Sequence, residues 1–131
     1  MDAGGVDRDG RIRLHQAAVE GQVAEVARLI AEGADVGATN KALITPLHMA
    51  CQQGYVDIAR LLLTAGAPVD ARDSFGNTPL WKAVFAFRGD PALLQLLLAA
   101  GADADSRNNA SKSPRDMALI FDRPGIRDVF A

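Results

Sequence analysis

A four-residue string recurs in this chain at intervals of thirty-three residues, and a repeat of that length restricts the fold more than any other feature. Thr-Pro-Leu-His begins at Thr45 and returns as Thr-Pro-Leu-Trp at Thr78, with weaker copies at Ile12 and Ser113. A second marker, Gly-Ala, begins at residues 33, 66 and 101. Its last interval is thirty-five residues, as is the interval from Thr78 to Ser113, whereas the earlier intervals are thirty-three. Because both markers shift together, a two-residue insertion lies in the third repeat, between residues 80 and 89.

Each repeat carries the local signals of two helices. Thr45 and Thr78 can cap a helix by accepting a hydrogen bond from an early backbone N–H. A proline follows each of them at the first helical position, where the backbone N–H that proline lacks would have no partner within the helix. Ser113 with its proline repeats the arrangement. A leucine-rich second helix then ends at a glycine, which adopts the left-handed conformation without steric cost. Since one helix pair cannot bury its apolar face alone, the pairs must stack.

These residues resemble the ankyrin repeat, whose pattern joins an Asp-x-x-Gly turn, Thr-Pro-Leu-His, small residues, a glycine, a leucine-rich outer helix and a closing Gly-Ala-Asp. The resemblance covers residues 7–131. It is carried most completely by the third repeat, which matches at Asp73, Gly76, Thr78, Pro79, Leu80, Ala83, Gly89, Leu96, Leu97, Gly101, Ala102 and Asp103. The resemblance implies an all-α fold, a curved solenoid of about four helix-turn-helix repeats with short hairpin-like turns, and it implies that the function is to bind another protein.

We expect a single domain over residues 1–131, with a flexible N-terminus at 1–6 and repeats at about 7–38, 40–71, 73–106 and 108–131. Glu25 and Arg28 of the first outer helix stand where the second has aliphatic residues, so the first repeat can face water as a cap. The fourth repeat is a shortened cap that ends the solenoid.

Two turns depart from the repeat pattern. Leu43 and Ser111 occupy the position that glycine holds in the third repeat, at Gly76. Because side chains other than glycine rarely take positive φ, a standard hairpin is not expected at these two junctions.

Composition excludes several classes of partner. The formal net charge is −2, without the basic stripe that nucleic-acid binding requires, so we expect no nucleic-acid partner. No apolar run has the length of a signal peptide or of a membrane span, and no membrane association is expected. The single cysteine, Cys51, cannot form an internal disulfide. These features favour a cytoplasmic protein.

No residue pattern indicates catalysis, a metal site or a cofactor. His15 and His48 occupy matching repeat positions, where the resemblance implies a structural hydrogen bond that holds turn to helix. Cys51 stands where the other repeats have Ala18 and Val84, so we expect a small buried core residue rather than a nucleophile. We find no Ser, His and Asp set, phosphate loop or paired metal motif.

The third repeat carries the main anomaly. Trp81 replaces the expected histidine, and the inner helix is predicted to continue through Arg88, two residues longer than its neighbours. On such a helix Trp81, Phe85 and Arg88 share one face, which indicates a binding hot spot. Alternatively, Trp81 and Phe85 fill space between the third and fourth repeats. The core-facing residues on the adjacent side are predicted to be Leu80, Ala83, Val84 and Phe87.

The family geometry adds contact candidates at turn and inner-helix positions that the fold does not fix. Phe75 is notable among them, because an aromatic side chain at a turn tip is most simply explained by a partner. The others include Arg11, Glu20, Lys41, Ile44, Gln52, Gln53, Asn77, Asn109, Lys112 and Phe121.

The string from Gly76 to Phe85 and the Asn108 to Pro114 junction resemble a bacterial subset of ankyrin proteins, many of which look like immunity proteins. This resemblance implies a monomer that binds a toxin or effector encoded nearby and blocks its active site. One alternative is a general adaptor or regulatory subunit of another complex. The alternative from a different class is an enzyme or small-ligand binder with an unrecognised site.

Overall fold

The computed structural model describes residues 13–130, whereas residues 1–12 and 131 lie outside the described part of the chain. The flexible segment predicted for residues 1–6 and the contact candidate Arg11 therefore lie outside the described residues. The described part forms helices joined by turns, without a strand. The helices are α1 Arg13–Val19, α2 Val23–Ala31, α3 Pro46–Gln53, α4 Val56–Thr64, α5 Pro79–Ala86, α6 Ala92–Ala99, α7 Pro114–Phe121 and α8 Ile126–Val129.

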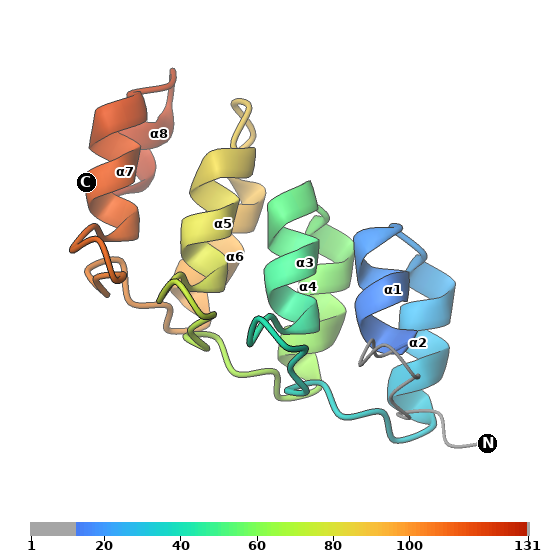
Figure 1. Ribbon diagram of the computed structural model, residues 1–131. Helices are drawn as coiled ribbons and strands as arrows, with labels where there is room; N and C mark the ends of the chain where they lie inside the picture. The colour runs from blue at the N-terminus through green and yellow to red at the C-terminus, as the bar shows by residue number, and fades with distance from the viewer. Residues whose placement is uncertain (1–12, 131) are drawn as a thin grey trace.

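The eight described helices stack as antiparallel pairs in two layers (Figure 1). The inner helices contact one another in the order α1, α3, α5 and α7, while α2, α4 and α6 form the outer row. The turns between pairs project together from one end of the stack (Figure 1). Between neighbouring pairs lies a continuous core that includes Leu47, Ile58, Leu80 and Leu97, none of which is exposed. The predicted all-α solenoid is confirmed.

The inner helices begin where the sequence predicts. The Thr45 hydroxyl accepts from the His48 backbone N–H at 3.2 Å, and a proline follows at the first helical position. The Thr78 hydroxyl caps α5 in the same way at 3.4 Å. In α7 the Ser113 hydroxyl accepts from the Asp116 N–H at 3.0 Å. Each cap satisfies a donor that the first turn would otherwise leave unpaired.

The predicted longer inner helix in the third repeat is wrong. Helix α5 ends at Ala86 and has eight residues, as α3 does. The glycine that ends α3, Gly54, has φ 78°, but the matching position is Phe87, which turns to an extended φ of −60° and ψ of 129°. Leaving the helix there buries the Phe87 ring, which is 4 % exposed. The two-residue insertion therefore lengthens the loop at 87–91 rather than the helix.

The turns at Leu43 and Ser111 form the same hydrogen bonds as the glycine turn, so the expectation of a non-standard hairpin is wrong. Leu43 has φ 62° and Ser111 φ 63°, close to the 79° of Gly76. An Asx side chain begins each turn: the Asn40 amide oxygen accepts from two backbone N–H groups, at 2.9 and 3.0 Å. Asp73 and Asn108 do the same at their turns, so these side chains hold the turn whatever residue takes the left-handed position.

Leu43→Gly should raise the free energy of unfolding by about 0.5–1 kcal/mol, because it removes a left-handed penalty that exceeds the extra backbone entropy of glycine in the unfolded chain. The Leu43 side chain is 48 % exposed, so its loss removes little packing. Urea denaturation measures the change. Ala42→Gly is the matched control, since Ala42 is not among the positive-φ residues and should be destabilised. Destabilisation of both variants would contradict the prediction.

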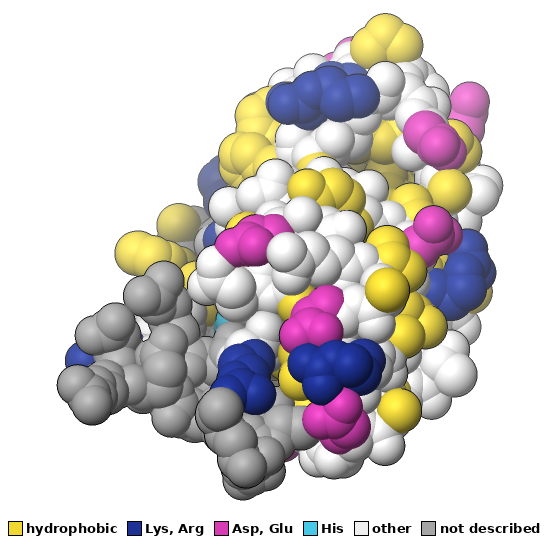
Figure 2. All heavy atoms as spheres, turned by 90° about the vertical axis from the view of Figure 1, so that its right-hand side faces the viewer, with side chains coloured by type: hydrophobic (Ala, Val, Ile, Leu, Met, Phe, Trp, Pro, Cys, Tyr) yellow, Lys and Arg dark blue, Asp and Glu magenta, His cyan; other side chains and the backbone are white. Residues whose placement is uncertain are grey.

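The first and last helix pairs of the described stack differ from the middle pairs: the first outer helix carries ion pairs, and the last outer helix is short. On α2, Arg28 pairs with Glu25 at 2.7 Å and with Glu32 at 2.5 Å. The N-terminal end in Figure 2 accordingly shows acidic and basic side chains side by side. At the other end α8 is only four residues long and buries Ile126 against the last inner helix. The first outer helix is thus polar on its exposed side, whereas the short last repeat leaves Leu119 and Ile120 of α7 exposed.

Candidate functional site

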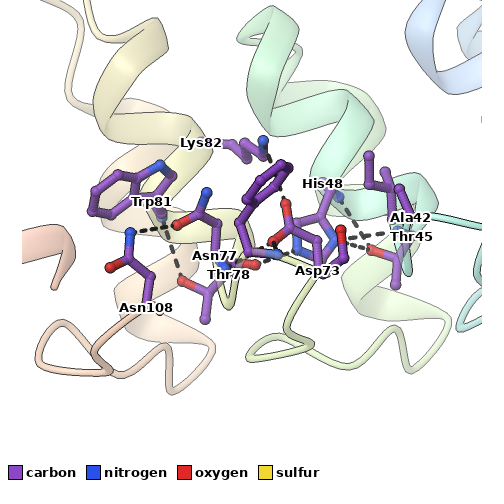
Figure 3. Close-up of polar contacts among 12 residues, drawn as sticks. Ala42, Thr45, His48, Asp73, Asn77, Thr78, Trp81, Lys82 and Asn108 are labelled. Atoms are coloured by element: carbon purple, nitrogen blue, oxygen red, sulfur yellow. Dashed lines mark hydrogen bonds and ion pairs between the residues drawn. The ribbon is translucent and has the colours of Figure 1, made fainter. Parts of the chain in front are cut away.

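His48 joins two successive repeats through both of its ring nitrogens. Its Nε2 lies 2.8 Å from the carbonyl oxygen of Asn77 in the next turn, and its Nδ1 lies 3.1 Å from the backbone N of Thr45 (Figure 3). A carbonyl can only accept and a backbone N–H can only donate, so Nε2 carries the proton and Nδ1 is the acceptor. The neutral ring is therefore the form that fits.

His15 makes the same link one repeat earlier. Its Nε2 lies 2.6 Å from the carbonyl oxygen of Ile44, while its buried Nδ1 has no partner among the described residues. Both histidines thus hold a turn to a helix, and the predicted structural role is confirmed. No group of three or more His, Cys, Asp or Glu side chains within residues 13–130 could hold a metal ion.

The stability of the fold should fall as the pH drops below about 6.5. Burial lowers the pKa of His48 and of His15 below the usual 6.5. Between the folded and unfolded pKa values the unfolded chain binds more protons, so acidification favours unfolding by at most about 1.4 kcal/mol per pH unit for each histidine. Urea denaturation at pH 7.5, 6.5 and 5.5 measures this slope. His15→Gln should reduce the slope, and a midpoint independent of pH would contradict the prediction.

The junction between the third and fourth repeats is held differently, because Trp81 replaces the histidine. Asn108 donates from its side-chain nitrogen to the Asn77 amide oxygen at 2.8 Å (Figure 3). Asn109 donates from its backbone N to the Phe75 carbonyl oxygen at 2.9 Å, as Ser74 does to Ala42 at the preceding junction, and from its side chain to the Ser74 carbonyl oxygen at 3.0 Å. The contact candidates Asn77 and Asn109 therefore use polar groups to hold the turns together.

Three aromatic side chains form a row on the inner helices of the last two repeats. The ring centroids of Trp81 and Phe85 are 5.4 Å apart, and those of Phe85 and Phe121 are 4.7 Å apart with an edge-to-face tilt of 76°. Phe85 remains 41 % exposed, and Trp81 and Phe121 are half-buried. We call Trp81, Phe85 and Phe121 the aromatic row. The row packs the third repeat against the fourth, as one interpretation of the sequence predicts. It also leaves aromatic surface exposed, as the binding interpretation requires.

Arg88 does not share a helix face with Trp81 and Phe85, because α5 ends before it. Its Nη1 donates to the carbonyl oxygens of Phe85 and Phe87, both at 2.9 Å. Arg123 reaches the same place from the fourth repeat and donates to the Phe85 oxygen at 2.7 Å. The two guanidinium groups thus donate to the backbone carbonyl oxygens at the C-terminal end of α5, where no glycine in the left-handed conformation caps the helix.

Arg123 is a site residue that the sequence interpretation missed. Its guanidinium carbon lies 5.0 Å from the centroid of the Phe121 ring, in cation–π geometry. It is thirty-eight residues from Phe85, and the periodic pattern gives no signal for this contact. Only the stacking of the fourth repeat on the third brings the two together.

Leu119 and Ile120 of α7 were also missed, although the repeat register could have indicated them. They are 46 % and 58 % exposed. Leu119 aligns with Val84 and Cys51, which are fully buried where a following repeat covers them. In the described chain no repeat follows α7 and α8, so this core position stays open.

The remaining predicted contact residues are spread along the turns and inner helices. Phe75 is 68 % exposed at the tip of the third turn. Gln53 lines a cavity of about 230 Å³ together with Ala86 and Arg88. Ile44 is half-buried, and the exposed polar candidates are Glu20, Lys41, Gln52 and Lys112. The structure brings Gln53 near the third repeat, while Glu20 lies at the end of α1.

Two side chains of reactive types, a cysteine and an aspartate, are buried within the repeat stack. Cys51 is fully buried, and burial raises the pKa of its thiol, so it is protonated at neutral pH. The Asp73 carboxylate is buried and lies 3.5 Å from the ammonium of Lys82 (Figure 3). The thiol is thus not poised as a nucleophile, in agreement with the prediction of a core cysteine.

Comparison with known proteins agrees with the stacked helix pairs. Residues 14–108 match a family model described as ankyrin repeats in three copies. The search of curated proteins gave no significant match. None of the helices in the described part has the length and hydropathy needed to cross a membrane.

Proposed function

Since the chain belongs to the ankyrin-repeat family, whose repeats bind other proteins, we propose that its third and fourth repeats hold a folded protein partner against the aromatic row. The observation that carries the proposal is the exposure of Phe85, at 41 %, within a packed row of three aromatic rings. Phe75, at 68 % exposure, extends the surface at the turn.

The packing of the row favours it as an anchor for a partner. Aromatic side chains lose little conformational entropy on binding, and they lose less still when neighbouring rings already fix their rotamers. Trp and Arg are also enriched among residues that dominate binding energy. Trp81, Phe85 and Phe121 are held by ring contacts within the stack, and Arg123 lies over the last of them. The surface is therefore pre-organised for binding.

We propose that the protein acts by occlusion rather than by catalysis. His48, His15 and Cys51 are buried in the scaffold. The partner class that the sequence resemblance favours is a bacterial toxin or effector, which the protein would neutralise in the cytoplasm as a monomer. A standard interface covers about 800 Å² on each partner, enough to close an active-site cleft.

Co-expression of the adjacent gene with and without this protein tests the inhibitor role. Growth should stop when the neighbour is expressed alone and should resume when both are present. Absence of toxicity, or toxicity that this protein does not relieve, contradicts the role. Capture of a host enzyme that remains active would instead indicate an adaptor.

Phe85→Ala tests the surface itself. Loss of a central aromatic anchor should weaken binding of a captured partner by at least 2 kcal/mol, or about thirtyfold. Gln95→Ala, on the exposed side of outer helix α6, is the matched control and should bind as the wild type. Circular dichroism checks that both variants are folded. Equal affinity of Phe85→Ala and wild type would show that the aromatic row is not the contact surface.

A further inference from the structure

Two guanidinium groups from different repeats meet at the C-terminal end of α5. The Nη1 atoms of Arg88 and Arg123 both donate to the carbonyl oxygens of Phe85 and Phe87, at distances of 2.7 to 3.0 Å. Because the two Nη1 atoms share two acceptors, they lie close together. A third acceptor, the carbonyl oxygen of Val84, lies 3.4 Å from Arg123.

No described carboxylate pairs with either member of this arginine pair. The end of a helix carries about −0.5 of an elementary charge, whereas the two guanidinium groups carry two positive charges. Neither Arg88 nor Arg123 forms an ion pair with a described carboxylate, although Arg28, Arg115 and Arg127 each do. The guanidinium groups of Arg88 and Arg123 thus have no paired carboxylate in the described part of the chain.

The arginine pair also retains open hydrogen-bonding capacity. No Nε or Nη2 atom of Arg88 or Arg123 donates to an acceptor in the described part of the chain. The two side chains line a cavity of about 240 Å³ with Gly89 and Pro124. At Gly89 no atom lies within 4 Å of the place where a Cβ would stand, so the approach is open. Planar guanidinium groups bind carboxylates through two parallel hydrogen bonds.

We infer that Arg88 and Arg123 form a binding site for a carboxylate side chain of the partner protein. The inference rests on the proposed function and adds the chemistry of the partner: an Asp or Glu that enters the cavity while an adjacent apolar side chain packs on the aromatic row. A carboxylate would offset one of the two positive charges of the arginine pair and accept from the Nε–H and Nη2–H groups that have no acceptor in the described part of the chain. Arg123 lines this cavity and also contacts the Phe121 ring and the Phe85 carbonyl oxygen, and it thus links the cavity to the aromatic row.

A pair of short peptides tests the site without an identified partner. The probes are acetyl-Leu-Glu-Leu-amide and acetyl-Leu-Gln-Leu-amide, which differ only in the carboxylate. Trp81, the single tryptophan, reports binding by fluorescence, and the side-chain Nε–H resonances of the two arginines report it by NMR. The glutamate peptide should shift both resonances and bind about tenfold more tightly than the glutamine peptide, as expected for hydrogen bonds to a charged group. Equal responses to both peptides would overturn the inference.

Three variants localise the response. Arg88→Gln should remove the preference for the glutamate peptide, and Arg88→Lys should retain only part of it, because lysine keeps the charge without the planar fork. Arg60→Gln changes the net charge equally on the exposed side of outer helix α4 and should behave as the wild type. An unchanged preference in Arg88→Gln, with folding confirmed by circular dichroism, would overturn the inference. Inorganic phosphate at matched ionic strength is the competing ligand, and tighter binding of phosphate would overturn the assignment to a carboxylate.

The partner itself separates this inference from the proposed function. If Phe85→Ala weakens partner binding while Arg88→Gln leaves both affinity and salt dependence unchanged, the carboxylate site is wrong and the binding surface stands. If Phe85→Ala has no effect, the proposed surface is wrong whatever the peptides show. Both variants should weaken binding, and the Arg88→Gln loss should shrink as salt is raised.

Discussion

Replacing His48 by leucine should lower the free energy of unfolding by about 2–4 kcal/mol. Leucine fills most of the space of the fully buried ring, so the loss comes from hydrogen bonds rather than from a cavity. The link to the Asn77 carbonyl oxygen disappears, and the buried backbone N–H of Thr45 loses its acceptor. A buried donor without a partner costs more than an average hydrogen bond contributes. Equilibrium urea denaturation at pH 7.5, where the histidines are neutral, measures the change.

His15→Leu is the matched control for this effect. His15 makes the corresponding bond to the Ile44 carbonyl oxygen, but its Nδ1 has no partner among the described residues. The loss should therefore be smaller, about 1–2 kcal/mol, because no described backbone donor is left unpaired. Equal losses for the two variants would show that the Thr45 contact contributes little.

Gly76→Ala should destabilise the protein by about 2–4 kcal/mol, the second large effect. Gly76 has φ 79°, where an added side chain costs about 1–2 kcal/mol. Its Cβ would also lie 2.6 Å from Arg72 Nη2, 2.7 Å from Asn109 Oδ1 and 3.0 Å from the Asn109 backbone N. That backbone N donates to Phe75, so an alanine pushes apart the third and fourth turns. Leu43 and Ser111 carry a side chain at the same turn position, so the added crowding is particular to the third turn.

Gly33→Ala separates the two causes. Gly33 also has positive φ, at 92°, but nothing lies within 4 Å of its would-be Cβ. Gly33→Ala should therefore lower the free energy of unfolding only by the backbone penalty of about 1–2 kcal/mol. Thermal and urea denaturation of both variants give the comparison. If Gly76→Ala lowers the free energy of unfolding no more than Gly33→Ala does, the third and fourth turns accommodate the added methyl group without loss of stability.

The sequence was sufficient for the features that recur in every repeat. The capping residues Thr45, Thr78 and Ser113 begin helices as predicted, and the histidine links follow from one residue at one repeat position. These are local or nearest-neighbour interactions, in which the partners are fixed by the period. The prediction of buried Leu80, Ala83 and Val84 is confirmed for the same reason, whereas Phe87 is buried although the helix predicted to place it ends at Ala86.

The sequence interpretation failed where a local signal was outweighed by other contacts. An absent glycine at Leu43 indicated a non-standard turn, but the Asn40 side chain holds the backbone in the left-handed conformation. A run of helix-compatible residues indicated a helix through Arg88, but burial of the Phe87 ring ends it at Ala86. In each case a hydrogen bond or an apolar contact outside the pattern determined the backbone.

The repeat, the helix pairs, their caps and most residues of the core thus follow from the sequence, because these features depend on the period and on local chemistry. The composition of the candidate site depends instead on how the repeats pack. Stacking of the fourth repeat on the third brings Phe121 against Phe85 and places Arg123 beside Arg88. The physical reason is that a solenoid buries its core between neighbours, so side chains far apart in sequence become one surface only after the repeats pack.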